Sequence, residues 1–525
     1  MRPKGIKGIA LLVAAVLLLV TPLAAIAGGR GNDAPRYWWE EGYLTPYERE
    51  LARDIMVLIL DAYFRIDISR MTSEEMDEVG RLIGYDGQEK VLRLFEHYAH
   101  KKGFEMPEPP EPPAPLPVEP EPYWWEIADP EAEIEGIMKQ VAEAKGMSPD
   151  EVRGRFGELF PGVDLWNMTF YEFSKFLNSL PRPARRPLSF DDLKRNPRII
   201  ALFGRVPAFS TEQELEEFNQ KLEKVLSDVA PLLRQLCRYE FPLGALVASQ
   251  GAISVAVRSD HLPRAEEVYE MIAKKAESLF GIQNVPVTFS NAVGGGPQGP
   301  PSSPTSTGWA PPWNEPFPEI PGAVKVTPAD DPARYTTASF AVQRFRWYWP
   351  WDPDEDYIIT GHKGPSETIT PVNMRINQPT PGYEAGRVSD NVGTHTYADA
   401  ARVGISDARV RPYILIGGTP SQPALRPVFA SGDPALGESI WISAGRTGLT
   451  FSVNVLRRHT FKNWGPWVEL KNQFLVRPVG DIWAIGGDSG SPYWHPVWDP
   501  VKGIHGAKIH GLHVGWEWVH GREST

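Results

Sequence analysis

The sequence predicts a multidomain protein in which helical modules and a small α+β domain precede an all-β C-terminal domain. Three observations favour this class. Apolar residues recur at helical spacing through the early part of the chain, whereas short apolar runs separated by turns fill the late part. Two proline-rich stretches also divide the chain, and its 525 residues are enough for two to four domains.

Composition limits the partners and the covalent chemistry of the chain. The net charge of −12 argues against nucleic acid, and against anionic lipid, as the main partner. The single cysteine, Cys237, excludes an internal disulfide. Because Cys237 lies on a helical apolar pattern in LLRQLCRYEF, we interpret it as a small core residue.

Residues 1–27 have the three parts of a signal peptide. Basic residues come first, the apolar run IALLVAAVLLLV follows, and Ala25, Ile26 and Ala27 form an A-x-A cleavage pattern. An uncleaved membrane anchor is the alternative, because the apolar stretch is nearly long enough to span a bilayer. Either interpretation puts the rest of the chain outside the cytoplasm, secreted or at the cell surface, with membrane contact only through an uncleaved N-terminal segment.

Two helical modules are expected, at residues 28–105 and 123–204. A stiff, acidic, proline-rich linker at 106–122 joins them. Thr45 and Thr72 precede segments with helical spacing and are good helix N-cap residues. The similar stretches RYWWE and PYWWE each precede such a segment, which suggests a duplicated module.

Residues 205–293 are predicted to form the small α+β domain. A helical stretch is followed by the strand-like runs FPLGALVASQ, GAISVAVRS and VPVTFSNAV, and a helix separates the last two. A looser linker rich in proline and glycine occupies 294–322. Residues 323–525 then contain short strand-like runs and turns, which is the pattern of a β-barrel or β-sandwich.

The segment IGGDSGSPYW at 485–494 carries the clearest chemical signal. Its glycines, Asp488 and Ser489 are all turn formers, so a plain surface turn is one interpretation. The other is that Ser489 is a nucleophile, which needs a base to take its proton and a third group to orient that base. His362, in DYIITGHKGP, and Asp399, in THTYADAARVGI, are the candidates for these two roles.

These segments resemble the chymotrypsin-like serine proteases of the trypsin and streptogrisin type. GDSGSP at 487–492 resembles their nucleophile motif, ITGHKG at 359–364 their histidine motif, and DAARV at 399–403 their aspartate segment. GESIWISAGRTGLTFSVNV at 437–455 is similar to a hairpin of the streptogrisin and alpha-lytic branch. The resemblance covers roughly 323–520 in the family's order of histidine, aspartate and serine, and it implies a chymotrypsin-like double β-barrel.

The resemblance also implies a serine endopeptidase that cleaves peptide or protein substrates through an acyl-enzyme and needs no cofactor. Ser489 would attack the peptide carbonyl, His362 would act as base and then as acid, and Asp399 would orient His362. The N–H groups of Gly487 and Ser489 would form the oxyanion hole. Asp488 corresponds to a family residue that pairs with a freed amino terminus or, in the streptogrisin branch, with an internal arginine.

A substrate pocket is implied at Trp483, Val514, Gly515 and Trp516. Trp483 stands at the pocket position where an aspartate would mean a preference for Arg or Lys, so that preference is not expected. Val514 stands where the family commonly has a serine. Lys363 replaces the cysteine that usually follows the histidine, and the family's last strand and C-terminal helix are expected to be shortened or missing.

Two other interpretations of the C-terminal region stay open. The first is metal binding, because histidine is a good zinc ligand. The spacings match no zinc motif, so solvated histidines and no metal site are expected. The histidines concerned are His495, His505, His510, His513 and His520. The second is a catalytically inactive, protease-like binding protein at the cell surface.

The regions upstream of the C-terminal domain need a role of their own. Residues 28–292 are expected to be wholly or partly a pro-region, removed by cleavage within 293–322. The 205–293 domain would be the part of it that assists folding and inhibits the enzyme. The alternative is that the helical modules are permanent binding or anchoring domains.

Overall fold

The computed structural model divides the chain into two compact units. One contains residues 1–113 with 343–354, and the other contains 114–342 with 355–525. The structure describes residues 46–103, 120–239, 243–257, 264–291, 312–317, 319–330, 335–346, 349–359, 374–379, 383–390, 400–405, 409–463, 469–480, 482–484, 488–500, 503–514, 517–519 and 522–524.

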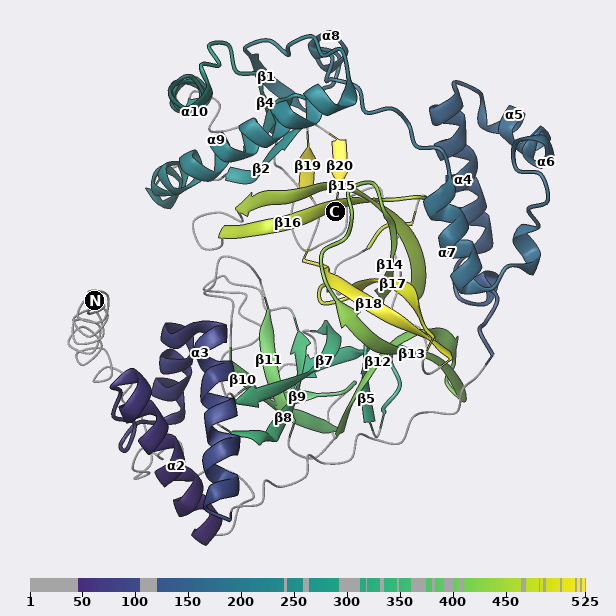
Figure 1. Ribbon diagram of the computed structural model, residues 1–525. Coiled ribbons are helices and arrows are strands. Elements are labelled where there is room, and N and C mark those ends of the chain that lie inside the picture. The colour runs from purple at the N-terminus through teal and green to yellow at the C-terminus, as the bar shows by residue number, and fades with distance from the viewer. Residues whose placement is uncertain are drawn as a thin grey trace. The chain divides into compact units, whose positions relative to one another are not determined.

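The first unit contains two long helices, α2 (Pro46–Phe64) and α3 (Ser73–Lys101), drawn in purple in Figure 1. Their apolar faces share one buried core. Thr72 caps α3 in a capping box, in which its side chain accepts from the Glu75 N–H and the Glu75 carboxylate accepts from the Thr72 N–H. The two predicted helices and this cap are confirmed, whereas Thr45 lies outside the described residues.

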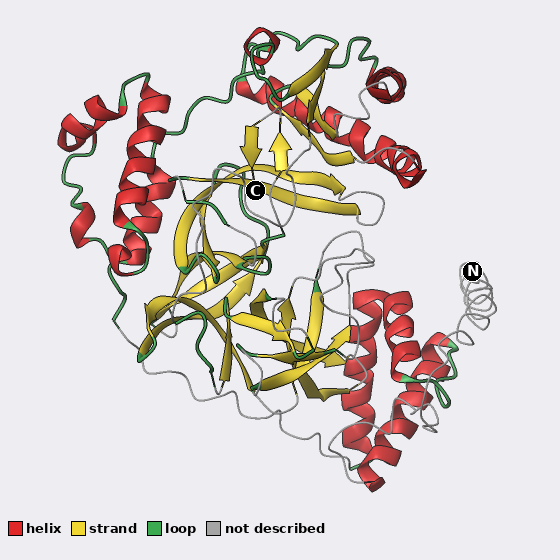
Figure 2. Cartoon of the chain, turned by 180° about the vertical axis from the view of Figure 1, so that it is seen from behind, coloured by secondary structure: helices red, strands yellow, loops and turns green. Residues whose placement is uncertain are grey.

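The second unit begins with a group of short helices, which Figure 2 shows in red. Asp129, Ser148 and Thr169 each cap a helix by accepting hydrogen bonds from backbone N–H groups of its first turn. Helices in this region are therefore confirmed. They are η2 (Trp124–Glu126), α4 (Pro130–Lys145), α5 (Pro149–Gly154), α6 (Phe156–Leu159), η3 (Leu165–Asn167), α7 (Phe170–Ser179) and α8 (Phe190–Leu193).

The predicted α+β elements are present, and their sheet has the order β1-β4-β3-β2. Helices α9 and α10 share a core with its strands. Strand β1 comes from the stretch expected to be helical, so the boundary expected at 204/205 falls after a strand of this sheet. The elements are β1 (Ile199–Phe203), α9 (Glu212–Tyr239), β2 (Leu243–Ser249), β3 (Ala252–Val257), α10 (Ala265–Phe280) and β4 (Val287–Asn291).

Six strands of the C-terminal region close into a barrel with the order β10-β11-β8-β7-β6-β9. When strands close into a barrel, each strand is paired on both sides, so the sheet has no exposed edge. A β-barrel is therefore confirmed for this part. The strands are β6 (Lys325–Pro328), β7 (Thr336–Arg346), β8 (Trp349–Ile359), β9 (Arg375–Asn377), β10 (Glu384–Asp390) and β11 (Ala401–Ile405).

In the described residues, the expected second barrel is part of a 12-stranded sheet and does not form a closed cylinder. The long strand β15 pairs with β14 and β16, and near its end Phe461 and Lys462 pair with β2 of the α+β domain. The α+β domain thus joins the same sheet through the last part of β15, on the side opposite β16. The strands are β5 (Glu319–Gly322), β12 (Arg409–Thr419), β13 (Gln422–Ser431), β14 (Ser439–Ala444), β15 (Leu449–Asn463), β16 (Glu469–Pro478), β17 (Pro492–Asp499) and β18 (Ile504–Leu512).

A small hairpin near the C-terminus lies against the α+β sheet. It consists of β19 (Glu517–Val519) and β20 (Arg522–Ser524), and β19 contacts β2, β3 and β4. No helix in the described ranges is both long enough and apolar enough to cross a bilayer.

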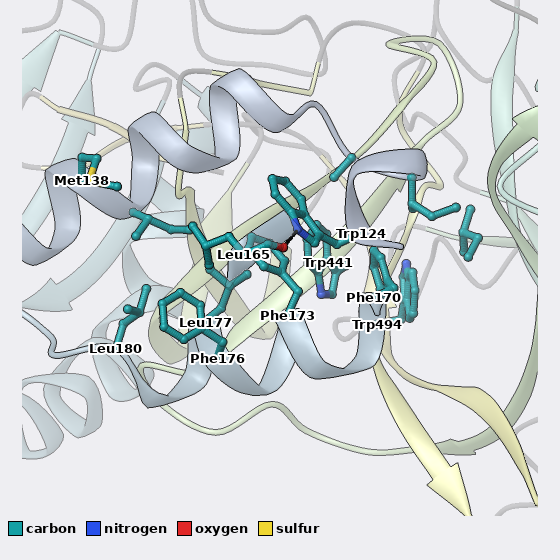
Figure 3. Close-up of a cluster of buried hydrophobic side chains, with 14 of the residues drawn as sticks. Trp124, Met138, Leu165, Phe170, Phe173, Phe176, Leu177, Leu180, Trp441 and Trp494 are labelled. Atoms are coloured by element: carbon teal, nitrogen blue, oxygen red, sulfur yellow. Dashed lines mark hydrogen bonds between the residues drawn. The ribbon is translucent and has the colours of Figure 1, made fainter. Parts of the chain in front are cut away.

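The helices at 124–180 share one hydrophobic core with the C-terminal sheet (Figure 3). Phe170 of α7 lies over Trp441 of β14, with their ring centroids 4.5 Å apart, and over Trp494 of β17 at 5.5 Å. The Trp441 indole N–H donates to the Ser174 hydroxyl at 2.7 Å. Both tryptophans are fully buried under these helices. The 124–180 part of the expected 123–204 module therefore has no core of its own, in contrast to the separate module that the sequence suggested.

Candidate active site

Ser489 lies in a buried turn just before β17, and the residue is 2% exposed. Its carbonyl oxygen accepts hydrogen bonds from the Thr337 N–H at 2.8 Å and from the Thr336 hydroxyl at 2.7 Å. These two threonines begin β7 of the closed barrel. The turn is therefore fastened where the closed barrel meets the large sheet, which rules out a plain surface turn.

The backbone of this turn is bonded on its other side to the end of β18. The Gly490 N–H donates to the His513 carbonyl, and the His513 N–H donates to the Ser491 carbonyl, both at 2.8 Å. Gly490 has a φ of +96°, a conformation that favours glycine. The glycine-rich sequence thus permits a sharp turn that is held from both sides.

The Ser489 hydroxyl is buried, and it has no hydrogen-bond partner among the described residues. Buried hydroxyls are normally paired, because an unpaired one costs about 1–3 kcal/mol. His362, Asp399 and Gly487 lie outside the described residues. The catalytic triad and the oxyanion hole therefore stay predictions.

The described strands show where the segments that contain His362 and Asp399 are attached. Ile359, the last residue of β8, pairs with Ala401, the first residue of β11. The residues between the neighbouring strands β7 and β8 are only 347 and 348, so these strands form a hairpin, and the start of β7 lies beside the end of β8. Both segments therefore join the barrel at the end where Thr336 holds Ser489.

Asp488 is fully buried and is bound by the turn between β14 and β15. Its carboxylate accepts from the backbone N–H of Arg446 at 2.7 Å, from the backbone N–H of Thr447 at 3.0 Å, and from the Thr447 hydroxyl. The Arg446 side chain contacts the hydroxyl of Tyr335, and its guanidinium carbon lies 4.7 Å from the centre of that ring. The resemblance implied an internal arginine in place of the amino terminus, whereas the contact in the structure is to the backbone N–H of Arg446. The Thr447 hydroxyl, which follows Arg446 in the GRTG stretch, was not foreseen.

The implied substrate pocket is only partly described. Val514 is half-buried and directly follows His513, whose backbone holds the Ser489 turn. Trp483 is also half-buried, in the short described segment 482–484. Gly515 and Trp516 lie outside the described residues. The pocket stays a prediction for all four positions.

The four C-terminal histidines within the described residues are buried or half-buried, and are not the solvated side chains that the sequence suggested. His513 is 2% exposed, and its Nδ1 lies 3.0 Å from the Tyr493 hydroxyl. His495 and His510 are half-buried and lie side by side. Burial lowers the pKa of His510 to about 4 and also lowers the pKa of His495 and His505. His520 lies outside the described residues.

Comparison with known proteins gives low similarities. Neither a protein-family model nor a curated protein matches the chain. A solved glutamic-acid-specific serine protease, described as using a histidine triad in substrate binding, has 18% identity over 38% of this chain and 86% of its own, with a TM-score of 0.28. Protease A of Thermobifida fusca has 18% identity over 36% of this chain and 90% of its own, with a TM-score of 0.22. Similarities this low do not establish fold or activity by themselves.

Proposed function

We propose that the chain is an exported serine endopeptidase that hydrolyses peptide bonds through an acyl-enzyme. The observation that carries this proposal is the Ser489 turn. It presents a buried hydroxyl without a described partner, at the barrel end where the segments containing His362 and Asp399 are attached. A base supplied by those segments would complete the hydrogen bonding of the Ser489 hydroxyl.

Chain length supports this arrangement. His362 follows Ile359 by three residues, so their Cα atoms are at most about 11 Å apart. Asp399 precedes Ala401 by two residues, which limits that separation to about 8 Å. Because Ile359 and Ala401 are paired, the histidine and the aspartate are tethered to one point of the barrel rim.

In the proposed mechanism, His362 removes the hydroxyl proton while Ser489 Oγ attacks the substrate carbonyl. Asp399 orients the imidazole and stabilises its charged form. The N–H groups of Gly487 and Ser489 donate to the developing oxyanion. His362 then protonates the leaving amine, and a water molecule repeats the sequence to release the acyl group from Ser489.

The buried contacts of Asp488 bear on activation. Its carboxylate is bound by Arg446 and Thr447 of the uncleaved chain, so a new amino terminus is not needed to hold the Ser489 turn. Any proenzyme control would then act by covering the substrate site. We propose residues 205–293 for that role, and residues 1–27 for export.

A fluorophosphonate probe, which reacts with activated serines, tests the proposal. We expect the full chain to be labelled at one residue, Ser489, with labelling abolished in Ser489→Ala and reduced on the order of 10⁶-fold in His362→Ala. Ser421→Ala, at an exposed serine, is the matched control and should be labelled like the wild type. Absence of labelling in the wild type, including chain cleaved in the 294–322 linker, would exclude the enzyme and favour the protease-like binding protein.

A further inference from the structure

Glu438, His495 and His510 form a compact cluster that the proposed peptidase mechanism does not use. Glu438 directly precedes β14, His495 lies on β17 and His510 on β18, and these three strands are consecutive in the large sheet. His495 Nδ1 lies 2.7 Å from His510 Nε2 and 3.2 Å from Glu438 Oε1. One ligand atom of each residue lies within 4.8 Å of the other two, and all three side chains are half-buried.

The loop after β13 fixes the orientation of two of these side chains. His510 Nδ1 donates to the Gly432 carbonyl at 2.6 Å, which leaves Nε2 as the nitrogen with a free lone pair. The Ala435 N–H donates to Glu438 Oε2 at 2.6 Å, which turns Oε1 toward His495. Backbone contacts of this kind orient the ligands of protein metal sites and set the tautomer of a ligating histidine.

The three facing atoms of the cluster cannot all be satisfied by hydrogen bonds to one another. His510 Nε2 and Glu438 Oε1 both face His495 Nδ1, which can carry only one proton. A single cation would satisfy all three atoms at once. Two imidazoles and one carboxylate are a common ligand set for zinc, which then takes water as its fourth ligand.

We propose that Glu438, His495 and His510 bind a divalent zinc-class cation. In a tetrahedral zinc site the ligand atoms are about 3.3 Å apart, which is close to the 3.2 Å between His495 and Glu438. The two imidazoles, at 2.7 Å, would need to separate by roughly 0.6 Å. This site does not depend on the proposed peptidase activity.

Two cations face the cluster and limit its affinity. Lys508, two residues before His510 on the same strand, disfavours positive charge on both histidines. Arg182, from the end of the helical region, interacts with the Glu438 charge. Glu438 therefore shares its negative charge with Arg182, and neutralising Lys508 should strengthen metal binding.

Zinc titration of the full chain against a chromophoric chelator tests the proposal. We expect one zinc ion per chain in the wild type, and binding weakened at least about tenfold in His510→Gln and in Glu438→Gln. His505→Gln, on the same strand, is the matched control and should bind like the wild type. Lys508→Met should bind more tightly. Cobalt(II) substitution should give the visible absorption of a tetrahedral site.

The proposal is overturned if the wild type binds no zinc, or if zinc binding is unchanged in both His510→Gln and Glu438→Gln. Circular dichroism shows whether the variants fold. If neither does, X-ray absorption of the zinc-loaded wild type decides. Two imidazoles and a carboxylate around the metal support the site, whereas any other ligand set rejects it.

Discussion

Glu133 of α4 binds Ser452 of β15 across the buried boundary between the helices and the C-terminal sheet. The Ser452 N–H donates to Glu133 Oε1 at 2.8 Å, and the Ser452 hydroxyl contacts Oε2. The Glu133 residue is 1% exposed, and burial raises the pKa of its carboxyl to about 7. A helix that the sequence suggested as part of a removable pro-region therefore supplies a hydrogen-bonding partner to the C-terminal sheet.

The raised pKa of Glu133 predicts that stability falls as pH rises. In the unfolded chain the carboxyl has its ordinary pKa of 4.5, so between pH 4.5 and 7 the folded state binds more protons than the unfolded state. The stabilising effect is complete below pH 4.5 and is lost as pH rises through 7. A pKa shift of this size corresponds to about 3 kcal/mol in the free energy of unfolding. Urea unfolding at pH 5 and at pH 8 measures it.

Glu133→Gln is the control for other titrating groups, because glutamine keeps the hydrogen bonds to Ser452 and cannot ionise. We expect the free energy of unfolding of wild type relative to Glu133→Gln to fall by about 3 kcal/mol from pH 5 to pH 8. An equal pH dependence in the two proteins would contradict the raised pKa.

Two helix glycines are predicted to respond in opposite directions to alanine. A Cβ on Gly136 of α4 would lie 2.3 Å from the Val479 carbonyl oxygen, whereas a Cβ on Gly154 of α5 would have open space. Alanine favours helix over glycine by about 1 kcal/mol. Gly154→Ala should therefore be neutral or stabilising, and Gly136→Ala should destabilise by about 1–3 kcal/mol. Thermal unfolding compares them, and stabilisation by Gly136→Ala would disprove the close contact.

Local structure was largely predictable from the sequence, because its causes are local. Thr72 precedes a segment of helical spacing and caps it, and the strand-like runs around Val255 and Phe289 form β3 and β4. The shared core was not predictable. Trp441 and Trp494 lie in short strand-like runs, and nothing in those runs indicates that Phe170, far away in sequence, covers them.

The same limit applies to the candidate sites. The Ser489 motif is continuous in sequence, so its turn could be recognised from GDSGSP alone. Thr336 holds that turn from a distant strand, and no local pattern indicates it. Likewise, the spacing of His495 and His510 matches no zinc motif, because strand pairing brings them together with Glu438, which directly precedes a third strand.

Cleavage of the 294–322 linker is predicted not to release the helices at 121–180. They share a hydrophobic core with the sheet, and Arg426 forms two hydrogen bonds with Glu121, at 2.8 and 3.0 Å, with both side chains at most 10% exposed. Separating the fragments would expose Trp441 and Trp494 and leave these charges unpaired.

An inserted protease site in this linker allows the measurement. After cutting, both fragments should elute together in gel filtration and separate only in denaturant, with the uncut chain as reference. If the C-terminal fragment elutes alone and remains folded, the helices are a removable pro-region after all.

The Thr447 hydroxyl is predicted to be a positioning group for Ser489, acting through Asp488. Thr447→Val removes one donor to a fully buried carboxylate, which should cost about 1–3 kcal/mol of stability and slow fluorophosphonate labelling of Ser489. Thr447→Ser keeps the hydroxyl and should label at near the wild-type rate. A purely steric role of the threonine methyl group, which valine keeps and serine lacks, would instead slow Thr447→Ser and leave Thr447→Val near the wild-type rate. Thr419→Val, at the exposed threonine that ends β12, controls for the loss of a hydroxyl elsewhere. Equal labelling rates in Thr447→Val and the wild type would show that Asp488 does not need this contact to hold the turn.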